Sequence, residues 1–393
     1  MSVINAAVGS RLYTSRGAIK AENIQVDDLL VADTRFALNP DSEPSHAIVT
    51  SSQSSLVGFF HEGLNTRRAI AITTDKGYRT TLHQDQYIVT PRGVKQAKEL
   101  TLDDCAYLTS AMAMAYSEED AYTMSTDVEE GASLLDRQFN MGRVLGWLIG
   151  DGTIKKSPRQ TQYLLYFCHT DIPLAYKFAE LFGGVSVGVQ TNNGSPTGTK
   201  TATVNIPVAL MPKRYTTKEE IDADMFTMPV ETVRGYLRGL FSADGSVAQY
   251  SISLNQSNLP RLETVQKLLM HFGIVSSISL RSEAGTYNWV KNGEVVATGP
   301  KKANYTLVIS GWNCNQFMSE IGFDVDSKAD KLETQAANRS TRAYKAETYC
   351  DGICEIEVLE DHEFNIIEVS KPNEEEYSSI FAYSSDGILC VAK

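Results

Sequence analysis

Two short segments of the chain end in the same pair of residues, an aspartate followed by a glycine. Val144–Gly152 reads VLGWLIGDG, and Leu237–Gly245 reads LRGLFSADG. Each is an apolar helical run with small residues four apart, which lie on one helix face and let two backbones approach closely. Glycine commonly ends helices, so Asp151 and Asp244 are expected at helix C-termini, where the helix dipole disfavours negative charge. If the small faces pack together, the two carboxylates meet and form a site for a hard divalent cation, Mg²⁺ by preference or Mn²⁺.

A single Asp-Gly after an apolar run would indicate only a helix end and a turn. Here the two copies lie 93 residues apart (244 − 151), and the segments C-terminal to them are also repeated. Residues 171–183 and 258–273 both read as helices that begin with an Asx cap and a nearby proline and end in Phe-Gly. Strand-like runs, such as 251–254 and 306–310, flank these helices. The pattern indicates an internal duplication.

The duplicated motif resembles the LAGLIDADG homing endonucleases in their single-chain, two-motif form, over about residues 137–335. The resemblance implies an α+β fold of two pseudo-symmetric αββαββα halves, about 137–232 and 233–335. In such a fold a saddle of strands lies in the DNA major groove. The resemblance also implies that Asp151 and Asp244 bind the metal ions and cut both strands of a long double-stranded DNA site.

A lysine that this family usually places three residues before the proline of the second motif helix is missing. Counting back from Pro229 gives Phe226. Lys213, or Lys328 or Lys331 near the end of the second half, could supply the charge. Spacing alone does not decide between them, since an exposed lysine normally only solubilises the protein.

Residues 6–110 are β-rich, with turns at Ser15-Arg-Gly, Asp75-Lys-Gly and Pro91-Arg-Gly. Their blocks, above all Thr80-x-x-His83, resemble the all-β, horseshoe-like Hint fold of inteins and Hedgehog-type autoprocessing domains. In that family the imidazole polarises the scissile peptide bond and protonates the leaving nitrogen, while the threonine helps to orient it. The resemblance therefore makes Thr80 and His83 candidate splicing residues. Asp85 is either the residue that fixes the imidazole tautomer or a solvated turn acid.

Both reaction centres of an intein are altered in this sequence. The family's spacing puts the first nucleophile at Ala6 and the cyclising asparagine at Ala392, with Val391 in place of the usual histidine. A methyl group cannot attack a carbonyl, so the chain is not expected to splice, through deliberate inactivation or natural decay. His362 fits the preceding block only if the strand there is 355–358 rather than 364–369.

The predicted organisation is a splicing domain interrupted by a nuclease. Residues 1–5 are an extein remnant or tag, 6–125 and 341–393 are the two parts of the Hint domain, and 126–340 are the endonuclease domain. Acidic residues 111–136 and residues 336–347 read as linkers into and out of the insert. The first and last strands of the splicing domain are expected to complete one sheet.

Charge is distributed unevenly along the chain. The 36 Lys+Arg and 48 Asp+Glu give a net charge of −12. Residues 137–335 hold 20 basic and 17 acidic residues, net +3, so the remainder is net −15. Only the duplicated segment could approach a phosphate backbone without long-range repulsion. The six scattered cysteines read as reduced, and Cys350-x3-Cys354 has no second pair that would indicate zinc.

The sequence as a whole predicts an intein with a Mg²⁺-dependent DNA endonuclease inserted in it, acting as a monomer in the cytoplasm. Its partners are double-stranded DNA and the flanking extein polypeptides, and no membrane association is expected. One alternative is a degenerate intein whose insert binds DNA, or serves as an RNA maturase, without cutting. Another, a self-releasing autoprocessing domain, would need a nucleophile near Ala6.

Overall fold

The computed structural model describes residues 2–31, 46–54, 68–109, 133–156, 161–191, 200–291, 294–336, 350–370 and 381–392. The chain divides into two compact units. The first takes in the described parts of Met1–Tyr116, Gln266–Ser277 and Arg342–Lys393, and the second those of Ser117–Val265 and Ile278–Thr341. Among the described helices, none is both long and apolar enough to span a bilayer.

The first unit contains one antiparallel system of fourteen strands built from both ends of the chain. Its strands are β1 (Ser2–Ala7), β2 (Arg11–Thr14), β3 (Gly17–Lys20), β4 (Leu29–Val31), β5 (His46–Ser54), β6 (Ala69–Thr74), β7 (Arg79–His83), β8 (Tyr87–Thr90), β9 (Gly93–Gln96), β10 (Cys105–Tyr107), β21 (Cys350–Leu359), β22 (Phe364–Val369), β23 (Phe381–Ser385) and β24 (Ile388–Ala392). The strand order is β10-β21-β6-β7-β1-β22-β5-β4-β2-β23-β24-β8-β9, with β3 paired to β2.

Strands from the two ends of the chain pair directly. β1 pairs with β22 over its whole length, from Ser2↔Val369 to Ala7↔Phe364, and β24 pairs with β8. The expectation that the first and last strands complete one sheet is confirmed. The predicted turns also form, and Gly17 and Gly93 have φ of 102° and 107°, a conformation that glycine adopts without a Cβ penalty.

The second unit repeats one arrangement twice. The first half contains α1 (Leu134–Ile149), β11 (Gly152–Lys156), β12 (Thr161–Phe167), α2 (Ile172–Glu180), β13 (Val187–Thr191), β14 (Lys200–Ile206) and α3 (Lys218–Asp224). The second contains α4 (Val230–Asp244), β15 (Gly245–Ala248), β16 (Ser251–Gln256), α5 (Leu259–Met270), β17 (Ser277–Ser282), β18 (Gly285–Lys291), β19 (Glu294–Lys301), β20 (Asn304–Ser310), α6 (Trp312–Glu320) and α7 (Asp326–Ala336). Of these, α5 from Gln266 onward and the first residue of β17 belong to the first compact unit.

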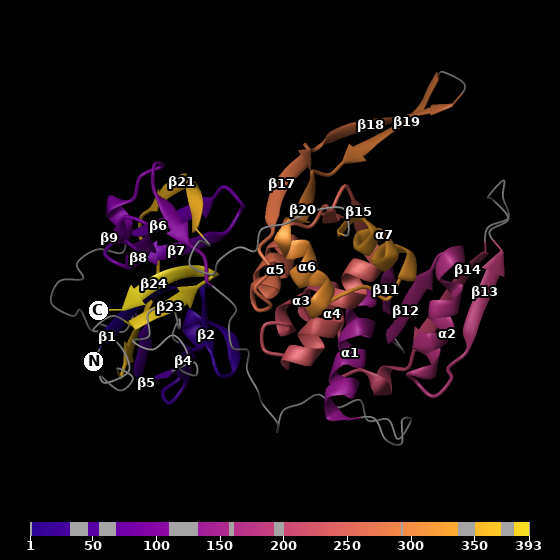
Figure 1. The fold of residues 1–393 in the computed structure, drawn as a ribbon, viewed down its shortest axis with the longest axis horizontal. Helices are drawn as coiled ribbons and strands as arrows, with labels where there is room; N and C mark the ends of the chain where they lie inside the picture. The colour runs from indigo at the N-terminus through magenta and orange to yellow at the C-terminus, as the bar shows by residue number, and fades with distance from the viewer. Residues whose placement is uncertain are drawn as a thin grey trace. The chain divides into compact units, whose positions relative to one another are not determined.

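The sheets of the two halves have matching topology. Their strand orders are β11-β12-β14-β13 and β15-β16-β20-β17. The central strands β12 and β14 of the first half therefore correspond to β16 and β20 of the second, and the edge strands β11 and β13 to β15 and β17. Helices α1 and α4 lie side by side between them (Figure 1). The second half has one addition, because β18 and β19 form a separate two-stranded sheet inserted between β17 and β20.

Two expectations about helix ends need correction. Residues 134–136, assigned from the sequence to a linker, are the first turn of α1, because Ser133 and Asp136 form a capping box that starts the helix early. Asp171 precedes α2 but makes no side-chain cap bond, and its carboxylate instead accepts a hydrogen bond from Cys168 Sγ at 2.9 Å. Asn258 does cap α5, since its Oδ1 accepts the Arg261 N–H at 3.2 Å.

The other linker predictions, for residues 111–132 and 337–347, lie outside the described residues. So do the predicted domain boundaries at 125/126 and 340/341.

Candidate functional site

The two motif helices pack backbone against backbone, and glycine makes this possible. A Cβ placed on Gly146 of α1 would overlap the carbonyl oxygen of Tyr236, and one on Gly239 of α4 would overlap that of Arg143. Gly142 and Gly235 are in the same situation one turn earlier on each helix. The small faces that the sequence predicted therefore meet along most of the helix pair.

This packing brings the C-terminal ends of the motif helices together. Gly150 is the C-cap of α1, and a Cβ at its position would lie 2.7 Å from the Ala243 Cβ and 3.4 Å from the Asp244 Cγ. Asp151 is the next residue, and Asp244 is the last residue of α4. The two carboxylates thus leave the same end of one helix pair.

Both carboxyl groups carry negative charge that their surroundings do not fully compensate. Removal of water by the surrounding protein raises the pKa of Asp151 and Asp244. The charge of Asp151 raises the pKa of Asp244 further, while a hydrogen bond from Gln256 Nε2 to its Oδ2, 2.6 Å long, opposes this. A cation between these groups would relieve the repulsion.

Two lysines, one from each half, sit at the ends of the motif helices. Lys218 Nζ donates to the Ile149 carbonyl of α1 at 2.5 Å, and Lys328 Nζ donates to the Ser242 carbonyl of α4 at 2.6 Å. Each ammonium therefore neutralises the negative end of a helix dipole. Burial lowers the pKa of both lysines, and the charges of Asp151 and Asp244 act against that shift.

The structure distinguishes among the lysines that the sequence left open. Lys328 lies at the site, whereas Lys213 forms an ion pair with Asp224 at 2.6 Å and Lys331 is exposed. Phe226, where the family's lysine was expected, is a core residue at 4% exposure. The sequence analysis missed Lys218 and Gln256. They reach the site only because α3 and β16 pack on the ends of the motif helices, and no spacing in the sequence indicates that packing.

The donor set fits Mg²⁺ bound partly by substrate. Among the described residues there is no cluster of three or more His, Cys, Asp or Glu side chains that could hold a metal ion. Mg²⁺ keeps several waters and commonly binds through one or two carboxylates plus phosphate oxygens. Asp151 and Asp244 would supply the carboxylates, leaving the remaining positions to water and to a phosphodiester.

Each lysine-bearing segment is held in place by a buried aspartate. Asp324 lies just before α7. Its carboxylate accepts hydrogen bonds from Arg143 Nε of α1 at 3.1 Å and from Arg238 Nε of α4 at 2.7 Å. Asp222 of α3 accepts the Tyr236 hydroxyl at 2.7 Å and Arg261 Nε at 2.8 Å. Both aspartates therefore tie their lysine-bearing helices, α7 and α3, to the motif helices.

Asp222→Asn is expected to lower the free energy of unfolding by about 3 kcal/mol, because it leaves the Arg261 guanidinium, 8% exposed, buried without its counter-ion. Urea unfolding followed by circular dichroism measures the loss. Glu219→Gln is the matched control, since Glu219 lies 3.5 Å from the same arginine but is 67% exposed and its loss should cost under about 0.5 kcal/mol. Equal stability of the two variants would contradict a structural role for the buried pair.

A second candidate site lies in the first unit, around β7. Thr80 and His83 are both buried at 2% exposure. The Thr80 hydroxyl lies 3.0 Å from the Ser385 hydroxyl. His83 Nδ1 accepts the Asp85 backbone N–H at 3.2 Å, which assigns the ring proton of a neutral imidazole to Nε2. The Asp85 carboxylate binds Lys98 at 2.6 Å and lies 3.9 Å from His83 Nδ1.

Ala6 and Ala392 are buried in the same sheet system. Ala6 of β1 pairs with Leu82 of β7, and Ala392 ends β24. Gln86, which no sequence motif marks, connects the two strands, because its Oε1 accepts the Asn5 N–H at 3.4 Å and its Nε2 donates to the Val391 carbonyl at 2.6 Å. His362 lies in the connection between β21 and β22, with its ring 5.6 Å from that of Phe364.

Comparisons with known proteins give one family model and several solved structures. Residues 231–322 match the family model described as LAGLIDADG-like domain. Among solved structures, the crystal structure of I-DmoI in complex with DNA and Ca is similar at 16% identity, covering 50% of this chain and 98% of that one, with a TM-score of 0.36. The gp41-1 intein covers 28% of this chain and 70% of its own, at 17% identity and a TM-score of 0.21.

Curated relatives match through a small part of their own length. A DNA polymerase of Thermococcus hydrothermalis is 29% identical over 127 residues, which span 31% of this chain and 7% of the polymerase. A probable translation initiation factor IF-2 of Thermococcus kodakarensis is 34% identical over 30% of this chain and 9% of its own. The tRNA-splicing ligase RtcB of Methanopyrus kandleri is 23% identical over 69% of this chain and 31% of its own.

The class of protein is defined by the family model: the chain carries a LAGLIDADG-like domain at residues 231–322. The resemblance to LAGLIDADG proteins that the sequence predicted is confirmed over this segment.

Proposed function

We propose that this chain is an intein whose inserted domain is a site-specific, Mg²⁺-dependent DNA endonuclease, and that its own splicing chemistry is disabled. The observation that carries the nuclease proposal is the meeting of Asp151 and Asp244 at one end of the glycine-packed helix pair. Two acids of this kind serve two phosphodiester bonds, one in each strand. Mn²⁺ is the expected substitute for Mg²⁺.

The residues around the acids have separate parts in the proposed reaction. Mg²⁺ held by Asp151 and Asp244 would acidify an attacking water and neutralise charge on the scissile phosphate. Asp151 and Asp244 hold the reacting groups in place at the C-terminal ends of the motif helices. Gln256 orients the Asp244 carboxylate through its 2.6 Å hydrogen bond. Lys218 and Lys328 offset charge that builds up as water attacks phosphorus and a P–O bond breaks.

The curated matches favour an inserted element over a host activity. The matching segments cover 7%, 9% and 31% of three proteins whose names describe unrelated reactions. What they share with this chain is therefore a segment that is independent of those reactions. An intein within a host protein, with extein polypeptides joined to both of its ends, has that property.

The splicing domain is the Hint part in this proposal, with Thr80 and His83 as the groups that would act on the peptide bond before residue 6. Ala6 and Ala392 stand where a nucleophile and a cyclising asparagine belong, and both side chains end in a methyl group. The parent reaction would need those two groups. We further propose that the chain acts as a monomer in the cytoplasm.

Ala6→Cys is expected to give thiol-dependent release of residues 1–5. The new thiolate at residue 6 would attack the Asn5 carbonyl, the C–N bond between the two residues would break as His83 protonates the leaving nitrogen, and dithiothreitol would then displace residues 1–5 from the resulting thioester. Mass spectrometry after incubation with dithiothreitol measures the release. The double variant that adds His83→Ala is expected to release the peptide at least about 100-fold more slowly, as the loss of a general acid implies. Release that is unaffected by His83→Ala would remove His83 from the proposal.

The nuclease is tested with a plasmid that carries the host gene without this insert, incubated with the protein and Mg²⁺. Specific double-strand cutting that EDTA stops is the expected result. Binding to the same DNA without any cutting would overturn the nuclease proposal and leave the DNA-binding alternative.

A further inference from the structure

A segment from the middle of the chain belongs to the β-rich first unit. Residues 266–277, which we call the α5 segment, comprise the end of α5 and the chain that leads to the first residue of β17. In sequence they lie inside the predicted endonuclease domain, 126–340. The first unit is therefore built from three stretches of sequence and not only from the two ends of the chain.

The α5 segment is packed into the core of the first unit. The Tyr78 hydroxyl lies 3.1 Å from Met270 Sδ and accepts the Ser276 N–H at 3.4 Å. The rings of Tyr13 and His271 meet edge to face, with their centroids 5.2 Å apart. All five residues are at most 6% exposed. Burial lowers the pKa of His271 to about 3, so its imidazole is uncharged at neutral pH, as such packing requires. These contacts fix the segment against β2 and the start of β7.

Lys267 of this segment reaches the turn between β23 and β24. Its Nζ lies 2.7 Å from Asp386 Oδ1, and the two side chains are 20% and 8% exposed. Asp386 and Gly387, with φ of 53° and 90°, form a two-residue turn between the paired residues Ser385 and Ile388. Positive φ at both positions is typical of a type I′ turn, for which Asp-Gly is a preferred pair. The turn explains the backbone at this point, but it does not require a buried carboxylate.

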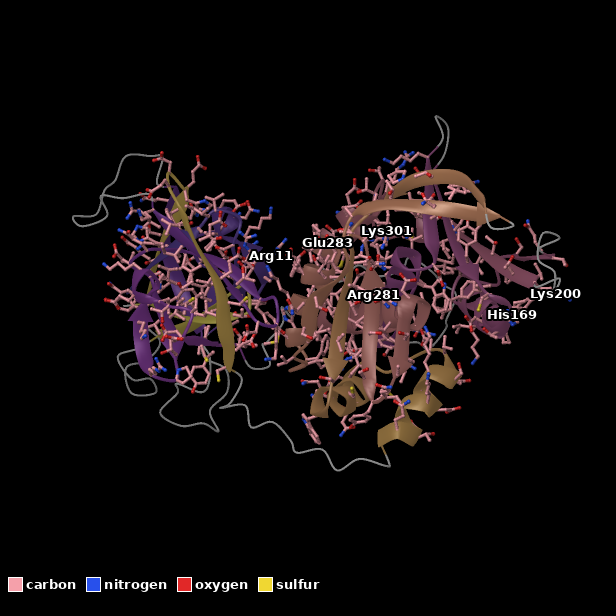
Figure 2. The ribbon with its side chains drawn as sticks, turned by 90° about the horizontal axis from the view of Figure 1, so that it is seen from above. Arg11, His169, Lys200, Arg281, Glu283 and Lys301 are labelled. Carbon is pink, nitrogen blue, oxygen red and sulfur yellow. The ribbon has the colours of Figure 1, made fainter. Side chains whose placement is uncertain are left out.

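Two basic residues offset the charge of Asp386. Besides Lys267 there is Arg11 of β2, which lies at one edge of the first unit in Figure 2. The Arg11 carbonyl accepts the Asp386 N–H at 3.0 Å. Burial lowers the pKa of Arg11, and the charge of Asp386 opposes this shift. The buried carboxylate is thus held between cations from β2 and from the α5 segment.

The second oxygen of this carboxylate faces Thr80. The Thr80 hydroxyl donates to Asp386 Oδ2 over 3.5 Å and lies 3.0 Å from the Ser385 hydroxyl. Because a carboxylate only accepts, the single hydroxyl proton of Thr80 points to Asp386, and Ser385 donates to Thr80. A contact of this length is at the limit of a hydrogen bond, so a small rotation of the carboxylate breaks it. The ammonium group of Lys267, on Oδ1, opposes that rotation.

We propose that Lys267 is a positioning residue of the splicing unit, which acts through Asp386 to hold the Thr80 hydroxyl in place. This inference rests on the proposed function, in which Thr80 belongs to the splicing site. It adds that a segment inside the predicted endonuclease domain serves the other chemistry of the chain. Removal of that domain together with the α5 segment would therefore slow the splicing reaction of the parent sequence.

The rate test uses the full chain with Ala6→Cys and follows the release of residues 1–5 by dithiothreitol. Adding Lys267→Met, which removes the charge and nearly keeps the length of the side chain, should slow this release by about tenfold. Adding Asp386→Asn should have a similar effect without disturbing the turn, because Asn-Gly also suits a type I′ turn. The variant with both changes should be no slower than Asp386→Asn alone, since Lys267 acts through that carboxylate.

Lys95→Met is the matched control for a loss of stability. Lys95 forms an ion pair of 2.6 Å with Asp104, a buried carboxylate of the same unit that also accepts hydrogen bonds from Thr101. Either lysine variant leaves a buried aspartate without its ammonium partner, so the two should melt at similarly lowered temperatures. Only Lys267→Met should slow the release, and Lys95→Met should stay within about twofold of the Ala6→Cys protein.

A second measurement does not depend on any reaction. In protein labelled at threonine methyl groups, the Thr80 methyl signal is assigned from its absence in Thr80→Val. Lys267→Met and Asp386→Asn should each shift this signal, because both release the Thr80 hydroxyl, and Lys95→Met should not. The same release rates and melting temperatures are measured on the same samples.

An unshifted Thr80 signal in Lys267→Met would overturn the positioning role. So would equal slowing by Lys95→Met, or a full additional effect of Lys267→Met on top of Asp386→Asn. If the Ala6→Cys protein released nothing at all, the proposed splicing function would fail. The Thr80 signal would then still decide whether Lys267 positions this side chain.

Discussion

Gly146→Val is expected to prevent the two motif helices from packing, and so to lower the free energy of unfolding of the second unit by more than about 3 kcal/mol. The added Cβ would overlap the Tyr236 carbonyl oxygen. It would also lie 2.7 Å from the backbone nitrogen of Leu240, one turn further along α4. Both obstacles are backbone atoms of a helix, so no side chain can turn away to make room. The helices would have to separate, and the packing of Gly142, Gly235 and Gly239 would be lost with them.

Thermal unfolding followed by circular dichroism measures this effect. The matched control is Gly188→Val in the exposed strand β13, where the nearest atom to an added Cβ is the Thr203 carbonyl oxygen at 3.8 Å. Valine also suits a strand, so the control should melt within a few degrees of the wild type. If the two variants melted alike, the close packing of α1 and α4 would not be what holds this unit together.

Asp244→Asn is expected to reduce double-strand cleavage by at least about 1,000-fold, and at the same time to make the metal-free protein slightly more stable at neutral pH. Cleavage falls because the amide cannot bind Mg²⁺ as a carboxylate does. Stability rises because burial, and then the charge of Asp151, raise the pKa of the Asp244 carboxyl group. An ionised carboxylate with a raised pKa opposes folding, and asparagine carries no charge.

The sign of the pH dependence is set by the same shift. A carboxyl group whose pKa is higher in the folded state stabilises the protein only when it is protonated, that is, below its ordinary value near 4, and this contribution is lost as pH rises through the folded value. The stability gap between Asp244→Asn and the wild type should therefore be largest near pH 7 and close towards about pH 4. Thermal melts in EDTA across this range provide the measurement.

Measuring cleavage and thermal stability on the same variant separates an effect on catalysis from an effect on folding. A variant that lost cleavage because it unfolded would melt earlier than the wild type, not later. Asp151→Asn should behave in the same way, since burial also raises the pKa of Asp151. Cleavage that persisted in either variant would remove that carboxylate from the proposed reaction.

The sequence predicted most of the elements that carry the nuclease site, because the duplication revealed them twice. Small residues at helical spacing and the Asp-Gly ends placed both carboxylates correctly at the ends of α1 and α4. The lysines were harder to place. Lys218 reaches the end of α1 because Asp222, on the same short helix, is held by Tyr236 and Arg261 from two other helices. No linear spacing encodes a contact that depends on three helices.

Strands β18 and β19 and the role of Gln86 were missed for a different reason. Residues 285–301 lack strict alternation of polar and apolar residues. Burial of one face produces that pattern, and the side chains here whose exposure is described are exposed. Gln86 was passed over because a single glutamine after a turn has no motif. Its position matters only because β8 lies next to β24 and its side chain also reaches β1. The roles of Thr80, His83, Ala6 and Ala392 stay predictions.

The paired strands at the ends of the chain also bear on how a surrounding polypeptide could fold. Gln86 hydrogen-bonds both Asn5 and Val391, so β1 and β24 are held close together within one unit. A polypeptide joined to both strands would enter and leave this unit at neighbouring points. For the folding of that polypeptide, the unit would be equivalent to a short surface loop. Loop-closure entropy rises only by about 0.6 kcal/mol for each doubling of a flexible loop, and a folded insert with neighbouring ends adds less. β10 and β21, paired at Tyr107↔Cys350, repeat this geometry where the chain departs for the nuclease and returns from it. At both places the intervening chain therefore begins and ends at neighbouring points of one sheet.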